Sequence, residues 1–209
     1  MRAPSAAVAG RGVGGGVRAG AAPAAAVLVL LAALASPPQT VRAQDVLTQQ
    51  EALRMAFPEP AEIERRTAFL DGEQLDEARE MAGGSVEIES EIVTYYVARE
   101  GDRELGAAYF DAHRVRTLQE VVMIVVDTAG AVDRVEVLKF NEPPEYRAPE
   151  GWIEQFEGRT LEPALSTRGD IANITGATLT ARALTRAVRK YLALQEVIEP
   201  FEAAGEGGG

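Results

Sequence analysis

The segment Leu118–Val126 constrains the fold most tightly, because it is largely apolar and does not alternate between apolar and polar residues. A strand with one solvated face alternates, so this pattern indicates a strand that is covered on both faces. The turn residues Asp127–Gly130 follow, and Val132–Phe140 then predicts a second strand. The chain must therefore fold around a sheet that other elements cover.

The segment Leu179–Ile198 is the strongest helical pattern in the chain. Its apolar residues recur at helical spacing and predict one buried stripe. That stripe contains Ala183, Leu184, Ala187, Val188, Tyr191 and Leu192. The opposite face holds Arg182, Thr185, Arg186, Arg189 and Lys190. We expect this second face to be solvated or, alternatively, to dock an anionic redox partner.

The rest of the chain predicts further short elements. Asp45–Phe57 reads as a helix that opens with a Thr48/Glu51 capping box and stops at Pro58. The other expected elements are a partly helical Ala61–Ala82, a strand over Val86–Arg99, a turn at Gly101-Asp102, a returning strand over Leu105–Phe110 and a short helix over Gly151–Glu157. Connected strands followed by a terminal helix predict an α+β fold, a mainly antiparallel sheet packed by helices on one side.

Residues 1–43 have the pattern of a signal peptide. They contain no Asp, Glu or Lys, carry arginines before the apolar core Val27–Leu31, and end in a small residue, Ala43. We expect cleavage after Ala43 and an extracytoplasmic mature protein; the alternative is an uncleaved membrane anchor. We divide the remainder into an N-terminal helical segment (44–84), a main domain (85–198) and a flexible tail (199–209).

Composition excludes several classes of function. All 32 acidic residues but only 17 of the 21 basic ones lie beyond residue 43, which gives that part a net charge of −15. A body so acidic is not expected to bind nucleic acid. The chain has no Cys and one His, so thiol catalysis, iron–sulfur clusters and multi-His metal sites are excluded. We predict no metal site and no catalytic residue.

The segment Ile174–Thr180 carries the most chemical information. It opens the terminal helix, so Thr178 lies where backbone N–H groups lack partners and an anion such as a phosphate is favoured. Gly176 allows close approach of a ligand to the backbone, and Ala177 keeps the space small. The Thr178 hydroxyl can therefore cap the helix, bind a phosphate or be esterified to one. The cap alone is a sufficient explanation on physical grounds.

These residues resemble the FMN-binding domain that occurs in the C subunit of the sodium-pumping NADH:quinone reductase and the G subunit of the Rnf complex. The resemblance extends roughly from Leu53 to Leu194. Besides Thr175–Thr180, it rests on Phe57-Pro58, Asp111–Thr117, Leu118–Gly130, Asn141-Glu142-Pro143-Pro144 and Trp152–Gly158. It implies that 85–198 is an FMN-binding domain and that FMN is the cofactor.

The resemblance also implies how the flavin is held. In the family, a flavin transferase attaches FMN through its phosphate to the last Thr of the Ser/Thr-Gly-Ala-Thr motif, which is Thr178 here. The cofactor-binding residues carried over are Thr175, Gly176, Ala177, Thr178, Leu179, Thr180 and Glu142. One position departs from the family: an acidic residue usually lies six positions before the acceptor, and this chain has Ala172, with Asp170 nearby. Either Asp170 substitutes or recognition by the transferase is impaired.

Four other residues have two interpretations each. Glu142 either orders its loop or hydrogen-bonds the isoalloxazine, or it is a plain loop charge before a Pro turn. His113 is a candidate proton relay or a surface or strand-edge His. Tyr146 and Trp152 could stack on the flavin or could pack in the core or a loop.

We expect an exported FMN-binding electron carrier, associated with the membrane, that exchanges electrons with membrane redox proteins. The flavin supplies the electron chemistry, and the protein supplies its placement. The first alternative is a non-redox extracytoplasmic module of the same fold in which Thr178 is only a helix cap. The second is a small flavoenzyme that reduces a diffusible substrate.

Overall fold

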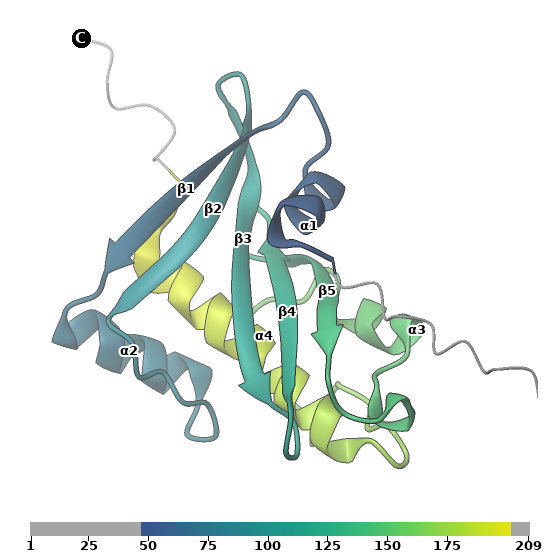
Figure 1. Ribbon diagram of the computed structural model, residues 1–209. Coiled ribbons are helices and arrows are strands. Elements are labelled where there is room, and N and C mark those ends of the chain that lie inside the picture. Colours follow the sequence, from purple (N-terminus) through teal and green to yellow (C-terminus); the bar gives the residue numbers. More distant parts are fainter. Residues whose placement is uncertain (1–46, 202–209) are drawn as a thin grey trace, which may run out of the picture. The chain divides into compact units, whose positions relative to one another are not determined.

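The computed structural model describes residues 47–201 (Figure 1). The described residues belong to one compact unit. The predicted signal peptide, its cleavage site after Ala43 and residues 202–209 of the predicted tail lie outside the described residues. Within 47–201, no helix is long and apolar enough to cross a membrane.

The centre of the fold is a five-stranded antiparallel sheet in the order β1-β2-β3-β4-β5. Its strands are β1 (Glu62–Phe69), β2 (Ile92–Glu100), β3 (Arg103–Arg114), β4 (Gln119–Val126) and β5 (Val132–Phe140). The helices are α1 (Gln49–Ala56), α2 (Gly72–Ala82), α3 (Glu150–Ile153) and α4 (Thr178–Ile198), with short 3-10 turns η1 (Pro144–Tyr146) and η2 (Glu154–Phe156). The predicted α+β class is confirmed.

Local sequence signals explain where these elements begin and end. Thr48 and Glu51 form the predicted capping box of α1, and Asp71 and Gln74 form another on α2. The turn at Gly101-Asp102 joins β2 to β3, with Gly101 at φ +62°, in the left-handed region. β5 ends at Phe140, just before the Asn141–Pro144 loop, where proline cannot continue a paired strand.

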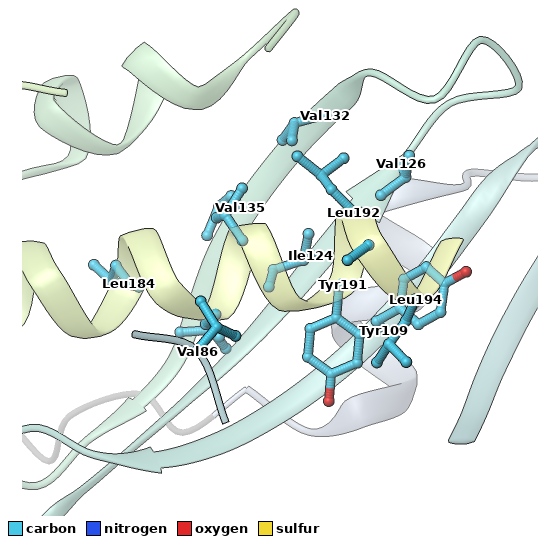
Figure 2. Packing of buried hydrophobic residues seen from close by; sticks show 14 of the residues in the cluster. Val86, Tyr109, Ile124, Val126, Val132, Val135, Leu184, Tyr191, Leu192 and Leu194 are labelled. Atoms are coloured by element: carbon cyan, nitrogen blue, oxygen red, sulfur yellow. The ribbon is translucent and has the colours of Figure 1, made fainter. Parts of the chain in front are cut away.

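The sheet is covered on both faces, as the apolar β4 sequence predicts. Val122, Ile124 and Val126 of β4 face the long helix α4, while Met123 and Val125 face α1. Figure 2 shows Leu184, Tyr191 and Leu192 of α4 in one cluster with residues of the strands. The whole predicted α4 stripe is buried, namely Ala183, Leu184, Ala187, Val188, Tyr191 and Leu192. Helices were expected on one side only; α1 covers part of the other because Ala52, Leu53 and Phe57 pack there.

Two predicted elements near the N-terminus are wrong in part. Residues 44–84 are not only helical, because Glu62–Phe69 pairs with β2 along its full length. This edge strand is mostly exposed, so it lacks the apolar alternation by which strands are recognised. The strand predicted over Val86–Arg99 begins only at Ile92. Val86 and Ile88 are buried and alternate with exposed residues, but they lie in the connection from α2 and pair with no strand.

The polar face of α4 also differs from the prediction. Arg182 and Arg186 are exposed as expected. Thr185 is buried and donates its hydroxyl to the Ala181 carbonyl at 2.7 Å. Arg189 is half-buried and donates to carbonyl oxygens of Met81, Ala82, Glu162 and Leu165. It therefore joins α4 to neighbouring segments instead of facing solvent.

Candidate functional site

No side chain within residues 47–201 caps the N-terminus of α4. Ala177 occupies the cap position and Thr178 is the first helical residue. The Thr178 hydroxyl lies 3.4 Å from the Ile174 carbonyl, the outer limit of a hydrogen bond, and it accepts no N–H of the first turn. The structure thus lacks the capping bond on which the helix-cap interpretation depends. The positive end of this long helix is left available to an anion.

The residues before Thr178 leave room for a ligand. Ala177 donates its N–H to the Ile174 carbonyl at 3.0 Å, which closes a tight turn. Gly176 lies in that turn at φ +84°, and a Cβ placed on it would meet no atom within 4 Å. Thr175 and Gly176 are exposed, Ala177 is buried and Thr178 is half-buried. A partly exposed hydroxyl beside open space and uncapped N–H groups fits the phosphate end of FMN.

The next two residues of α4 have different surroundings. Leu179 is 47% exposed, so part of its apolar side chain faces solvent at the first turn of α4. Thr180 is buried and donates its hydroxyl to the Tyr146 carbonyl at 2.6 Å. Thr180 therefore ties the η1 loop to α4, and its hydroxyl is already engaged.

Glu142 holds the β3–β4 loop. Its Oε1 accepts the backbone N–H groups of Arg116, Thr117 and Leu118 at 3.1, 2.6 and 2.8 Å. These bonds, that from Leu118 first, lower the pKa of the Glu142 carboxyl. Of its predicted roles, ordering the loop is the one that the contacts support, and the plain loop charge is wrong.

Arg116 extends this connection to the site. Its guanidinium lies 4.3 Å from the centre of the Tyr146 ring, a cation–π contact. Tyr146 in turn accepts the bond from Thr180. Glu142, residues 116–118, Tyr146 and the first turn of α4 thus form one connected region. Sequence analysis missed Arg116, because nothing in the local pattern marks a contact across this loop.

Trp152 supports the segment before the motif. Its indole Nε1 donates to the Ala172 carbonyl at 2.7 Å, and its ring meets Phe156 edge-on at 5.5 Å between centres. Gln155 Oε1 accepts the Ala172 N–H at 2.8 Å. Ala172, where the family usually has an acid, is therefore fixed through its backbone. Asp170 is half-exposed and pairs with Arg159 at 3.1 Å.

His113 lies in a buried ionic network that the strand-edge interpretation did not foresee. Its Nδ1 is 2.8 Å from Asp111 Oδ2 and its Nε2 is 3.0 Å from Glu120 Oε2. Lys190 of α4 donates to Asp111 Oδ1 at 2.8 Å. The second oxygen of the fully buried Glu120 has no hydrogen-bond partner among the described residues.

The electrostatics of this network favour charged forms. Burial alone would lower the pKa of His113, but the hydrogen bonds to Asp111 and Glu120 raise it to about 9. Burial would raise the pKa of Asp111, but bonds from His113 and Lys190 lower it to about 2. The network therefore joins β3, β4 and α4 through paired charges.

Comparison with known proteins agrees with the geometry. Residues 119–193 match the FMN-binding domain family. This range runs from β4 through Glu142 and the 174–178 motif into α4. No curated protein matches the chain. The chain therefore contains an FMN-binding domain, and FMN is its cofactor.

Proposed function

We propose that this protein is an exported electron carrier whose FMN is esterified through its phosphate to Thr178. The observation that carries the proposal is the uncapped first turn of α4, where the half-buried Thr178 hydroxyl borders open space. The match over residues 119–193 supports FMN as the group bound there. Signal-peptide features in residues 1–43 support export, and the partners are membrane redox proteins.

Each residue of the site has a distinct task in this proposal. In the attachment step, the Thr178 oxygen attacks the flavin-side phosphorus of a flavin dinucleotide, the pyrophosphate P–O bond breaks, AMP leaves and the Thr178 proton is released. The first N–H groups of α4 stabilise the phosphate charge. Glu142, Arg116 and Tyr146 hold the neighbouring loops in place through the contacts given above. Exposed Leu179 and Leu118 offer apolar surface that a bound ring could cover. The flavin, once bound, supplies one- or two-electron chemistry.

Co-expression with a flavin transferase tests the attachment. The denatured wild-type band should fluoresce as flavin, and Thr178→Val should abolish the fluorescence because it removes the acceptor oxygen while keeping the side-chain shape. Thr178→Ser should retain some labelling. Thr160→Val is the control, because Thr160 is exposed and lies outside the motif. Thr180→Val is a poorer control, since it breaks the bond to Tyr146.

The substitution Asp170→Ala tests whether Asp170 takes the place of the acidic residue that the family usually has at the position of Ala172. Loss of labelling would mean that Asp170 replaces the missing acid, whereas unchanged labelling would mean that the transferase does not need one here. A wild-type protein that stays colourless with an active transferase and ample flavin dinucleotide as donor would contradict covalent attachment. Failure to bind free FMN as well would remove the carrier proposal.

A further inference from the structure

Four arginines near the candidate site lack carboxylate partners in a protein rich in carboxylates. The chain has 32 acidic and 21 basic residues, so most cations are expected to find an acid nearby. Arg66, Arg79, Arg103 and Arg159 do so, whereas Arg54, Arg65, Arg147 and Arg168 form no ion pair among the described residues. Among the described residues, no acid lies within ion-pair distance of Arg114, Arg116, Arg182 or Arg186. We call these four residues the arginine band.

The arginine band lies beside the first turns of α4. Arg114 ends β3, and Arg116 follows in the loop that contacts Tyr146. Arg182 and Arg186 lie one and two turns beyond Thr178 on α4. All four are exposed, and Arg114 and Arg186 line one groove of about 720 Å³ between α4 and the sheet.

The other cations of this groove are neutralised. Lys190 and His113 both line it, but each is bonded to Asp111. The groove cations without an acidic partner among the described residues are therefore Arg114 and Arg186. Exposed unpaired cations on an acidic protein produce a local field of opposite sign to the net charge.

The cofactor does not account for the whole arginine band. A helix rises about 1.5 Å per residue, so Arg186 lies about 12 Å along the axis from Thr178. A phosphate on Thr178 is within reach of the first N–H groups of α4 but not of Arg186. Arg114 is placed beside Arg186 by the groove, so it too points to an additional anion.

We propose that the arginine band is the docking surface for an acidic protein partner that exchanges electrons with the flavin. The assignment of the partner's role rests on the proposed function; the anion preference rests on the geometry alone. Complementary charges would speed encounter and set the orientation in which the partner meets the site.

The structure favours an acidic protein over an anionic membrane. The same groove is also lined by the exposed carboxylates Glu87 and Glu89. A broad anionic bilayer would meet these acids together with the arginines and be repelled by the net negative protein. A folded partner can present acids to the arginine band alone.

A labelled oligo-glutamate peptide tests the surface without any flavin. The wild-type protein should bind it at low ionic strength, and Arg114→Glu with Arg186→Glu should weaken binding by about tenfold or more. Lys139→Glu combined with Arg54→Glu is the control matched in charge, because both residues are exposed and neither lines the groove. It should change affinity less than about twofold. Urea unfolding of each variant checks that the fold is kept. Equal weakening by the Lys139→Glu/Arg54→Glu control and by the Arg114→Glu/Arg186→Glu variant would overturn the proposal, since net charge alone would then explain binding.

Oxidation of the reduced, flavin-loaded protein by ferricyanide tests the link to electron exchange. Each ferricyanide anion accepts one electron, and the wild-type rate should fall as salt is added, whereas the Arg114→Glu/Arg186→Glu variant should show no fall. A wild-type rate that rises with salt would overturn the link. In another outcome, the protein binds the peptide through the arginine band and yet never takes up flavin. That result would support the docking surface and overturn the proposed function. The wild-type protein should not bind vesicles rich in anionic lipid. If it does bind them, and the Arg114→Glu/Arg186→Glu variant does not, the partner is a membrane and the proposal of a protein partner is overturned.

Discussion

The first turn of helix α4 and the body of that helix differ in how deeply their side chains are buried. From Ala183 to Leu194 the helix is packed against the sheet and α2, and Leu184 and Val188 are fully buried. At its first turn Leu179 is 47% exposed and Thr178 is half-buried with no capping bond. Packing fixes the body of the helix, so the first turn can remain open without loss of the fold. The first turn is uncapped, and the stability of the fold does not depend on it. We therefore expect a ligand to bind there.

The largest effect should come from the ionic network that joins the body of α4 to the sheet. His113→Gln removes the cation between Asp111 and Glu120, so the fully buried Glu120 loses its charged partner while Asp111 keeps Lys190. Breaking a buried pair in this way should cost about 3–5 kcal/mol. Urea unfolding at neutral pH measures it, and Arg186→Gln on the exposed face is the control, with a change within about 0.5 kcal/mol.

The pH dependence of wild-type stability should report the same network. The raised pKa of His113 means that its contribution is complete below pH ~6.5 and is lost as pH rises through about 9. The lowered pKa of Asp111 means that its contribution is present above pH ~4 and is lost as pH falls through about 2. Unfolding free energies across this range should show both losses. An alkaline loss that persists unchanged in His113→Gln would assign it to another group.

Two leucine substitutions compare the stability contributed by the first turn of α4 with that contributed by its body. Leu184→Ala should destabilise by ~2–5 kcal/mol, because its side chain is fully buried. Leu179→Ala should change stability by less than ~0.5 kcal/mol, because nearly half of that side chain is already in water. Denaturant unfolding of both variants provides the measurement. Similar losses for the two would mean that the first turn is packed as tightly as the body.

Glu142→Gln should have an intermediate effect. The amide keeps an acceptor oxygen but loses the negative charge that strengthens three backbone bonds, so we expect a loss of about 1–2 kcal/mol. Faster hydrogen exchange at the amides of residues 116–118 would locate the change. Unchanged exchange there would mean that Glu142 does not hold this loop.

The smallest stability effect is expected at the proposed attachment residue itself. Thr178→Val should cost no more than ~0.5 kcal/mol before flavin is attached, because the hydroxyl makes only one long contact. A helix cap would predict about 1 kcal/mol. Urea unfolding of the flavin-free protein separates the two, and a loss of 1 kcal/mol or more would favour the cap interpretation.

Sequence analysis predicted the elements whose burial follows a regular period. β4, β5 and α4 were placed within one residue of their observed ends, because continuous apolar runs and helical stripes mark them directly. β1 was missed because an edge strand is held by backbone pairing to β2 and needs few apolar side chains. The start of β2 was misplaced because Val86 and Ile88 alternate in burial without a pairing partner.

The candidate site likewise contains some residues that the sequence predicts and others that it does not. Thr178, Gly176 and Glu142 could be predicted from a local motif and a resemblance. The contact of Arg116 with Tyr146 and the bonds of His113 to Glu120 could not, because they join residues from separate segments and depend on the final register of β3 and β4. Thr180 was grouped with the ligand-binding residues because it is near Thr178 in sequence, whereas its hydroxyl is bonded to the Tyr146 carbonyl.

Locating the flavin on the chain tests the central claim most directly. Cleavage after Arg168 and Arg182 releases one peptide that contains Thr175, Thr178 and Thr180. Fragmentation of that peptide by mass spectrometry, from protein produced with an active flavin transferase, identifies the modified residue. We expect the mass of esterified FMN on Thr178 and on neither of the other two threonines. An unmodified peptide, or FMN on Thr175 or Thr180, would contradict the account.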